Sequence, residues 1–163
     1  MTQSGKLKLR SSEQDSMLLL DNQTCFALYA ASRSMTKVYQ PLLKKLGLTY
    51  PQYLVLLILW EKDGVTVSEL GDRLDLDSGT LTPLLKRMES SKFLNRDRSL
   101  TDEREVRISL TTLGRALRTQ ALSIPEKVIC ASRCSRTELS ALTRKLNELR
   151  KSLQVAGLES DQK

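Results

Sequence analysis

The stretch that decides the fold is "DSGTLTPLLKRMES" (residues 77–90), which ends as a good helix former but begins with residues that weaken a helix. Its apolar residues recur at positions i, i+3, i+4 and i+7 and are predicted to face inward: Leu81, Leu84, Leu85 and Met88. Short, polar or basic residues occupy the front, the opposite face and its edges: Ser78, Gly79, Thr80, Thr82, Pro83, Lys86 and Arg87. A major groove about 12 Å wide admits a helix only when the residues nearest the base edges are short or hydrogen-bond to them. The pattern therefore predicts a helix that enters the major groove of double-stranded DNA, with Asp77 as its N-cap.

Pro83 leaves two positions open for the start of this helix. A proline beyond the first helical turn loses a backbone hydrogen bond and costs up to about 3 kcal/mol, so stability alone does not favour a start at Asp77. The alternative is a helix with Thr82 as N-cap and Pro83 as its first residue, which is an ordinary position for proline.

Two helices are expected ahead of this stretch. The first is expected to be capped by Asp21 or Asn22 and to bend at Pro41. The second has apolar residues on almost all sides from Tyr53 to Trp60, as a central core helix would have, and ends at the exposed sequence EKDG (61–64).

A short helix and a β-hairpin are predicted on either side of the opening stretch. Thr66-x-x-Glu69 has the form of a capping box and predicts the start of the short helix. After the opening stretch, Val106, Ile108 and Leu110 alternate with polar residues at period two, which is typical of a strand. The sequence therefore predicts a charged hairpin between residues 93 and 110.

The hairpin region concentrates arginines within twelve residues of chain: Arg96, Arg98, Arg104 and Arg107. An arginine at the tip of such a hairpin can enter the minor groove of DNA, where the potential is most negative. Acidic neighbours nearly cancel this charge, so a solvated charge run is the alternative interpretation: Asp97, Asp102, Glu103 and Glu105. The hairpin follows directly after a helix with a small polar face. This position favours the wing of a DNA-binding domain over a solvated charge run.

A second capping-box pattern, Ser135-x-x-Glu138, predicts a last helix. Its leucines follow a 3-4-3-4 spacing: Leu139, Leu142, Leu146, Leu149 and Leu153. So narrow an apolar seam suits a partner helix better than a broad core, and two heptads are too short to be stable alone. We therefore expect a homodimer to which both chain ends contribute helices.

These elements together predict a mainly α-helical fold with a small β-hairpin wing, the winged form of the helix-turn-helix. One domain is expected over residues 1–163, with the winged helix-turn-helix at 49–111. Residues 17–46 and 112–156 are expected to form the dimerisation helices. A dimer with two recognition helices is expected to bind a pseudo-palindromic operator in double-stranded DNA.

Composition narrows the function. The 163 residues include 26 Lys and Arg against 19 Asp and Glu, and a formal charge of +7 favours a polyanionic partner. The absence of histidine removes His-based triads, general bases and metal ligands, so we expect no enzyme, no metal and no cofactor. Three cysteines at no zinc-like spacing argue against a disulfide framework.

The longest apolar run has eight residues and the N-terminus has no signal core, so we expect a cytoplasmic protein without a membrane segment.

Five stretches between about Leu18 and Leu153 resemble the MarR family, and within it the peroxide-sensing organic hydroperoxide resistance regulators. These stretches are "CFALYAASRSMTKVYQPLL" (25–43), "LGLTYPQYLVLLILWEKDG" (46–64), "LDSGTLTPLLKRMES" (76–90), "DEREVRISLT" (102–111) and "CASRC" (130–134). The resemblance implies a winged-helix homodimer that represses transcription until an organic hydroperoxide oxidises a reactive cysteine.

The resemblance also implies roles for individual residues. Cys25 would be the sensing thiol, with Tyr39 and Tyr50 as its hydroxyl partners. Cys130 would be the resolving thiol, with Cys134 as the other candidate. Ser78 to Arg87 would form the recognition helix, and Asp102 with Arg104 the wing motif.

Cys25 has a second interpretation, and Lys92 departs from the family pattern. Without the family, Cys25 reads as a small apolar filler on the core face of a helix. Near a helix start, the macrodipole favours its thiolate, although Asp21 one turn earlier opposes this. Lys92 stands where the family commonly has glycine, and a positive φ there would cost lysine up to about 1 kcal/mol.

Three classes of function remain open from the sequence. The first is a repressor that senses organic hydroperoxides through Cys25. The second is a repressor of the same fold that is released by a small aromatic ligand in the dimer cleft. The third, a thiol peroxidase, is disfavoured because an arginine-rich wing would serve no purpose in it.

Overall fold

The computed structural model describes residues 15–98 and 106–160, and the side chains of residue 98 and residues 157–160 are not described. The chain forms two compact units, one that ends at Tyr50 and one that begins at Pro51.

Among its described residues, the first unit contains a short 3-10 turn and one long helix. The turn η1 spans Leu20–Asn22, and the helix α2 spans Thr24–Lys44 with Gln23 as its N-cap. The expected start at Asp21 or Asn22 is wrong, because both residues belong to the turn and the side-chain amide of Asn22 donates to the Ser16 carbonyl at 2.7 Å. Pro41 lies inside α2, which continues to Lys44.

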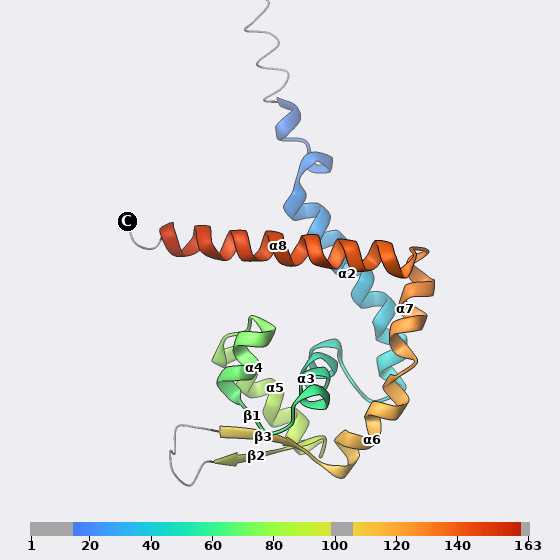
Figure 1. The fold of residues 1–163 in the computed structure, drawn as a ribbon, viewed down its shortest axis with the longest axis vertical. Helices are drawn as coiled ribbons and strands as arrows, with labels where there is room; N and C mark the ends of the chain where they lie inside the picture. Colours follow the sequence, from blue (N-terminus) through green and yellow to red (C-terminus); the bar gives the residue numbers. More distant parts are fainter. Residues whose placement is uncertain (1–14, 99–105, 161–163) are drawn as a thin grey trace, which may run out of the picture. The chain divides into compact units, whose positions relative to one another are not determined.

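The second unit contains the predicted winged helix-turn-helix (Figure 1). Its helices α3, α4 and α5 span Tyr50–Glu61, Val67–Leu74 and Ser78–Ser90. The capping box predicted for α4 is confirmed: the Glu69 amide donates to the Thr66 hydroxyl at 3.1 Å, and the Thr66 amide donates to the Glu69 carboxylate at 2.7 Å. The core of this unit is built by large apolar side chains that are at most 1 % exposed, among them Leu56, Leu59, Leu70, Leu85, Met88, Leu94 and Ile108.

The predicted hairpin is present, and a third strand joins it. Strands β2 (Leu94–Arg98) and β3 (Val106–Leu110) pair antiparallel, with Leu94 opposite Leu110. The sequence pattern did not reveal β1 (Val65–Thr66), which pairs antiparallel with β3 through Val65 and Ile108. The sheet order is β1-β3-β2, so β3 lies at its centre.

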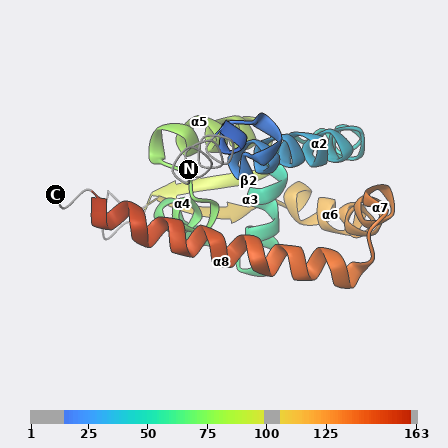
Figure 2. The ribbon, with the colours of Figure 1, turned by 90° about the horizontal axis from the view of Figure 1, so that it is seen from above.

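Three helices follow the sheet: α6 (Thr112–Ala121), α7 (Ile124–Ser132) and α8 (Arg136–Ser160). The capping box predicted before the last helix is confirmed, since the Glu138 amide donates to the Ser135 hydroxyl at 3.2 Å and the Ser135 amide donates to the Glu138 carboxylate at 2.8 Å. α8 is one continuous helix over this length (Figure 2). No helix in the described part of the chain meets the length and hydropathy of a membrane span.

Candidate nucleic-acid interface and thiol site

The helix of the opening stretch, α5, begins at Ser78 and not at Pro83. The Asp77 carboxylate caps it by accepting from the Thr80 amide and the Thr80 hydroxyl, both at 2.9 Å. These hydrogen bonds, the backbone one first, lower the pKa of Asp77. The alternative start with Thr82 as N-cap is therefore wrong. Pro83 is the sixth residue of the helix, where it forfeits a backbone hydrogen bond.

The two faces of α5 divide as predicted. The four inward residues are buried: Leu81, Leu84, Leu85 and Met88. The outer residues are exposed except for the half-buried Thr82: Ser78, Gly79, Thr80, Pro83, Lys86 and Arg87. A Cβ on Gly79 would lie 3.0 Å from the capping oxygen of Asp77, so the front of the helix has no room for a side chain without movement of the cap.

The predicted wing cations fall in different environments. Arg96 on β2 turns toward α5 and forms an ion pair with Glu89 at 3.6 Å, and its side chain is only 20 % exposed. Its Nε atom is buried without a hydrogen-bond partner in the part of the chain that the structure describes. The Arg107 guanidinium donates to the Gly64 carbonyl at 3.2 Å. Arg98 ends β2, and the predicted wing residues Asp102 and Arg104 lie outside the described residues.

The junction between α5 and the wing requires the left-handed backbone anticipated at Lys92. Lys92 has φ +59°, and its amide donates to the Glu89 carbonyl at 2.8 Å. The Thr111 hydroxyl donates to the Lys92 carbonyl at 2.6 Å, which ties the turn to the start of α6. The strain expected of a non-glycine residue at this turn is therefore present.

Cys25 lies in the first turn of α2 and is exposed as a free thiol. Tyr39 and Tyr50 lie near the other end of the same unit, with their ring centroids 5.0 Å apart and an interplanar angle of 55°. Burial raises the pKa of both hydroxyls, and the neighbouring Tyr50 raises that of Tyr39 further. Both hydroxyls therefore stay protonated at neutral pH and can donate hydrogen bonds.

One chain does not bring Cys25 and the tyrosine pair together. Cys25 and Tyr39 are 14 positions apart on one uninterrupted helix, which at 1.5 Å per residue separates them by about 21 Å. Side chains do not span that distance, and the Tyr50 ring lies beside the Tyr39 ring, so the predicted hydroxyl contacts cannot form within one chain.

The other two cysteines lie around the end of α7. Cys130 is in its last turn, and Cys134 follows Arg133, which has φ +56°. Both thiols are exposed and free. The Cys134 amide donates to the Ser132 hydroxyl at 3.2 Å, so this cysteine is held beside the helix end.

The leucine seam of α8 lies open to solvent in the single chain. Four of its members are 37 % to 61 % exposed: Leu142, Leu146, Leu149 and Leu153. A helix with such a seam has an apolar face still to be covered.

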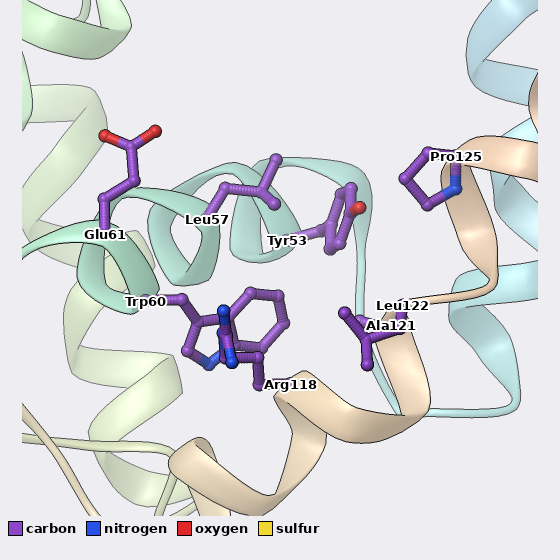
Figure 3. Close-up of a pocket in the computed structure, with 8 residues that line it drawn as sticks. All are labelled: Tyr53, Leu57, Trp60, Glu61, Arg118, Ala121, Leu122 and Pro125. Atoms are coloured by element: carbon purple, nitrogen blue, oxygen red, sulfur yellow. The ribbon is translucent and has the colours of Figure 1, made fainter.

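A cavity of about 260 Å³ lies between α3 and the segment from α6 to α7 (Figure 3). Its walls are mainly apolar and come from both sides: Tyr53, Leu57, Trp60, Glu61, Arg118, Ala121, Leu122 and Pro125. Glu61 is committed to an ion pair with Arg73 at 2.5 Å. No group of three or more His, Cys, Asp or Glu side chains suited to a metal occurs among residues 15–98 and 106–160.

Sequence reasoning missed Asp63, which it placed in an exposed turn. Its carboxylate accepts hydrogen bonds from the Gly64 amide at 3.0 Å and the Leu110 amide at 2.9 Å, and it pairs with Arg115 at 2.5 Å. Two of these partners are 47 and 52 residues away, so no local pattern could have indicated them.

Comparison with known proteins gives three findings. The sequence pattern of the family described as transcriptional regulator SarA/Rot matches residues 37–120. The organic hydroperoxide resistance transcriptional regulator of Bacillus subtilis (strain 168) is 52 % identical over 134 residues, which cover 82 % of this chain and 91 % of that protein.

Solved structures of the regulator AbfR, which comes from Staphylococcus epidermidis, give the third finding. Overoxidised AbfR bound to DNA is 39 % identical with a TM-score of 0.70, over 86 % of this chain and 98 % of that one. Disulfide-formed AbfR is 38 % identical with a TM-score of 0.56, over 88 % of this chain and 96 % of that one.

Proposed function

Because the chain belongs to the MarR/SarA family of winged-helix transcriptional regulators, in the group of the organic hydroperoxide resistance regulators, we propose that it is a repressor that senses organic hydroperoxides. In this proposal the reduced protein occupies its operator and leaves it when Cys25 is oxidised. The family consists of transcriptional regulators and not of enzymes, so the thiol peroxidase interpretation is dropped.

The observation that carries the proposal is an exposed free thiol in the first turn of α2, in a chain whose exposed recognition face is small and polar. The partial positive charge at a helix N-terminus attracts a negatively charged thiolate. Similarity to AbfR, which has been crystallised overoxidised on DNA and in a disulfide form, supports both DNA binding and thiol chemistry.

The chemistry proceeds in two balanced steps. The Cys25 thiolate attacks the distal oxygen of the hydroperoxide, which gives a sulfenic acid and, after proton transfer, an alcohol. The thiol of Cys130 then condenses with the sulfenic acid, which gives a disulfide and water. Cys134 is the alternative resolving residue, since it is exposed beside the same helix end.

A homodimer solves the geometric difficulty at Cys25. Because α2 holds Cys25 about 21 Å from Tyr39 of its own chain, the hydroxyls that stabilise the thiolate must come from Tyr39 of the partner subunit and Tyr50 of the partner subunit. The open leucine seam of α8 supplies an apolar surface for that dimer. The wings and recognition helices of both chains then bind the two halves of a pseudo-palindromic operator.

A gel-shift assay with and without cumene hydroperoxide tests the proposal. Release that dithiothreitol reverses supports a thiol switch. Continued binding at saturating hydroperoxide contradicts it.

The tyrosine pair yields a kinetic prediction. Tyr39→Phe and Tyr50→Phe should each bind operator normally but release it several-fold more slowly after hydroperoxide, because each removes one hydroxyl bond to the thiolate and keeps the ring volume. Stopped-flow measurement of sulfenic acid formation gives the rate. Tyr29→Phe is the control, since the Tyr29 hydroxyl already accepts from Arg33 at 2.9 Å. A normal oxidation rate in both variants would exclude this role.

The recognition helix yields a prediction about specificity. Thr82→Ala should relax the preference for particular base pairs by roughly 1–3 kcal/mol if the hydroxyl or methyl group reads a base edge. Lys86→Ala should instead weaken all sequences alike and flatten the salt dependence, since a lost phosphate contact releases fewer counterions. Binding to an operator library at two salt concentrations separates the two effects. A uniform loss for Thr82→Ala would argue against base reading.

One observation favours a second candidate, a repressor released by a small aromatic ligand. The cavity beside α3 is lined by Tyr53, Trp60 and the guanidinium of Arg118, and Arg118 forms no hydrogen bond or ion pair within residues 15–98 and 106–160. An aromatic acid of that size would find apolar walls and one cation. Release of operator by such an acid from the Cys25→Ser variant would favour this candidate over the thiol switch.

A further inference from the structure

Asp63 joins the helix-turn-helix to the base of the wing. It follows α3, and its Oδ1 atom accepts hydrogen bonds from the Gly64 amide at 3.0 Å and the Leu110 amide at 2.9 Å. Its Oδ2 atom pairs with Arg115 at 2.5 Å. Leu110 ends β3 and Arg115 lies in α6, so one carboxylate holds three segments together.

The backbone around Asp63 is shaped for this contact. Gly64 has φ +73°, a conformation that L-residues with a side chain rarely adopt, and the chain then enters β1 directly. The Gly64 carbonyl accepts from Arg107 of β3 at 3.2 Å. Hydrogen bonds to a charged carboxylate are stronger than neutral ones, so Asp63 makes a strong polar link between the end of α3 and the central strand.

The outer strand of the wing, β2, is held by contacts separate from those of Asp63. Arg96 of β2 pairs with Glu89 of α5 at 3.6 Å. At the start of α6, a Cβ on Gly114 would lie 2.0 Å from the Phe93 carbonyl, so only glycine allows the helix to approach β2 this closely. Asp63 holds the central strand β3 and Arg96 holds the outer strand β2, so both strands of the wing are tied to the helices of the domain.

We propose that Asp63 is a positioning residue for operator binding, because it sets where the wing stands relative to α5. A winged helix contacts the major groove with one element and the neighbouring groove with another, so the distance between them must match the DNA. Asp63 itself need not touch DNA. The inference rests on the proposed function, since it assumes that the wing contributes to binding.

Two substitutions separate the parts of the contact. Asp63→Ala removes all three bonds and should weaken operator binding about tenfold or more, as expected for losing hydrogen bonds to a charged group. Asp63→Asn keeps an oxygen for the two amides and loses only the charge toward Arg115, so a loss of about threefold is expected. Glu126→Gln is the matched control, because it makes the same charge change in the exposed ion pair with Arg136.

Hydroxyl-radical footprinting distinguishes positioning from simple destabilisation. In Asp63→Ala we expect protection at the flanking, wing-contacted positions to disappear while the central protection by α5 persists. An equal loss at all positions, with a matching fall in melting temperature, would reduce Asp63 to a structural residue and overturn the proposal. Unchanged affinity in Asp63→Ala would also overturn it.

Amide hydrogen exchange tests, without DNA, whether Asp63 anchors the Leu110 amide of β3; this contact is called the anchor. The Leu110 amide should exchange at least tenfold faster in Asp63→Ala, remain protected in Asp63→Asn, and be unaffected in Glu126→Gln. If the wild-type protein binds no operator but this exchange pattern is found, the proposed function fails and the anchor stands. If exchange at Leu110 does not change, the anchor fails whatever the DNA result.

Discussion

Cys25→Ser should leave operator binding nearly unchanged and abolish its release by organic hydroperoxide. Serine keeps the size of the side chain at an exposed position in the first turn of α2, so neither the fold nor the recognition helix should be disturbed. The hydroxyl is not oxidised by a hydroperoxide, so the switch has no first step. Gel shifts of the wild type and the variant, titrated with cumene hydroperoxide, measure the effect.

The other cysteines provide the controls for this result. Cys130→Ser should still be oxidised at Cys25 but should stop at the sulfenic acid or proceed to the irreversible sulfinic acid. Non-reducing mass spectrometry then identifies the peptide linked to Cys25 in the wild type. If Cys134→Ser gives this phenotype instead, Cys134 resolves; if neither does, a small-molecule thiol caps the sensor. If Cys25 stays a free thiol while DNA is released, the peroxide-sensing proposal is wrong.

Leu146→Glu combined with Leu149→Glu should dissociate the dimer and abolish operator binding. Both leucines lie on the open seam of α8, where they are 39 % and 37 % exposed in the single chain. Burying the two carboxylates in a helix interface costs several kcal/mol per ion, and the substitution also removes two leucines of the seam. A monomer then binds one half-site without the effective concentration that links two. Analytical ultracentrifugation and gel shift measure the two effects.

The matched control places the same charge on the opposite face of α8. Ser140→Glu with Asn147→Glu changes two exposed positions of the helix outside the leucine seam. We expect this variant to remain a dimer and to bind operator with at most a modest loss from the added negative charge. A Leu146 and Leu149 variant that sediments as an intact dimer would place the interface elsewhere.

Features with local causes could be predicted from the sequence. The capping boxes at Thr66 and Ser135 and the cap at Asp77 involve residues three apart, so their pattern is visible in the chain itself. The inward face of α5 follows from helical periodicity in the same way. These local signals were sufficient to predict the winged helix-turn-helix and the exposed face of α5.

The candidate thiol site was predictable only as a set of residues. The resemblance to the family named the residues, but the sequence did not indicate which of their side chains lie in contact. The uninterrupted course of α2 separates Cys25 from Tyr39, while the turn after that helix brings Tyr39 to within 5.0 Å of Tyr50. In the proposed dimer, the hydroxyls that face the thiol therefore come from the second chain.

What the sequence by itself determined is the order and type of the elements, the apolar and polar faces of α5 and the leucine seam of α8. What only the tertiary structure decided is how the wing is attached. Strand β1 has two residues and exists only by pairing with β3, about 40 positions later. Asp63 and Arg96 look like ordinary surface charges until Leu110, Arg115 and Glu89 are brought to them by the fold. The physical reason is that helix caps and faces depend on neighbours within one or two turns, whereas the partners of a half-buried charge between elements are set by the tertiary fold.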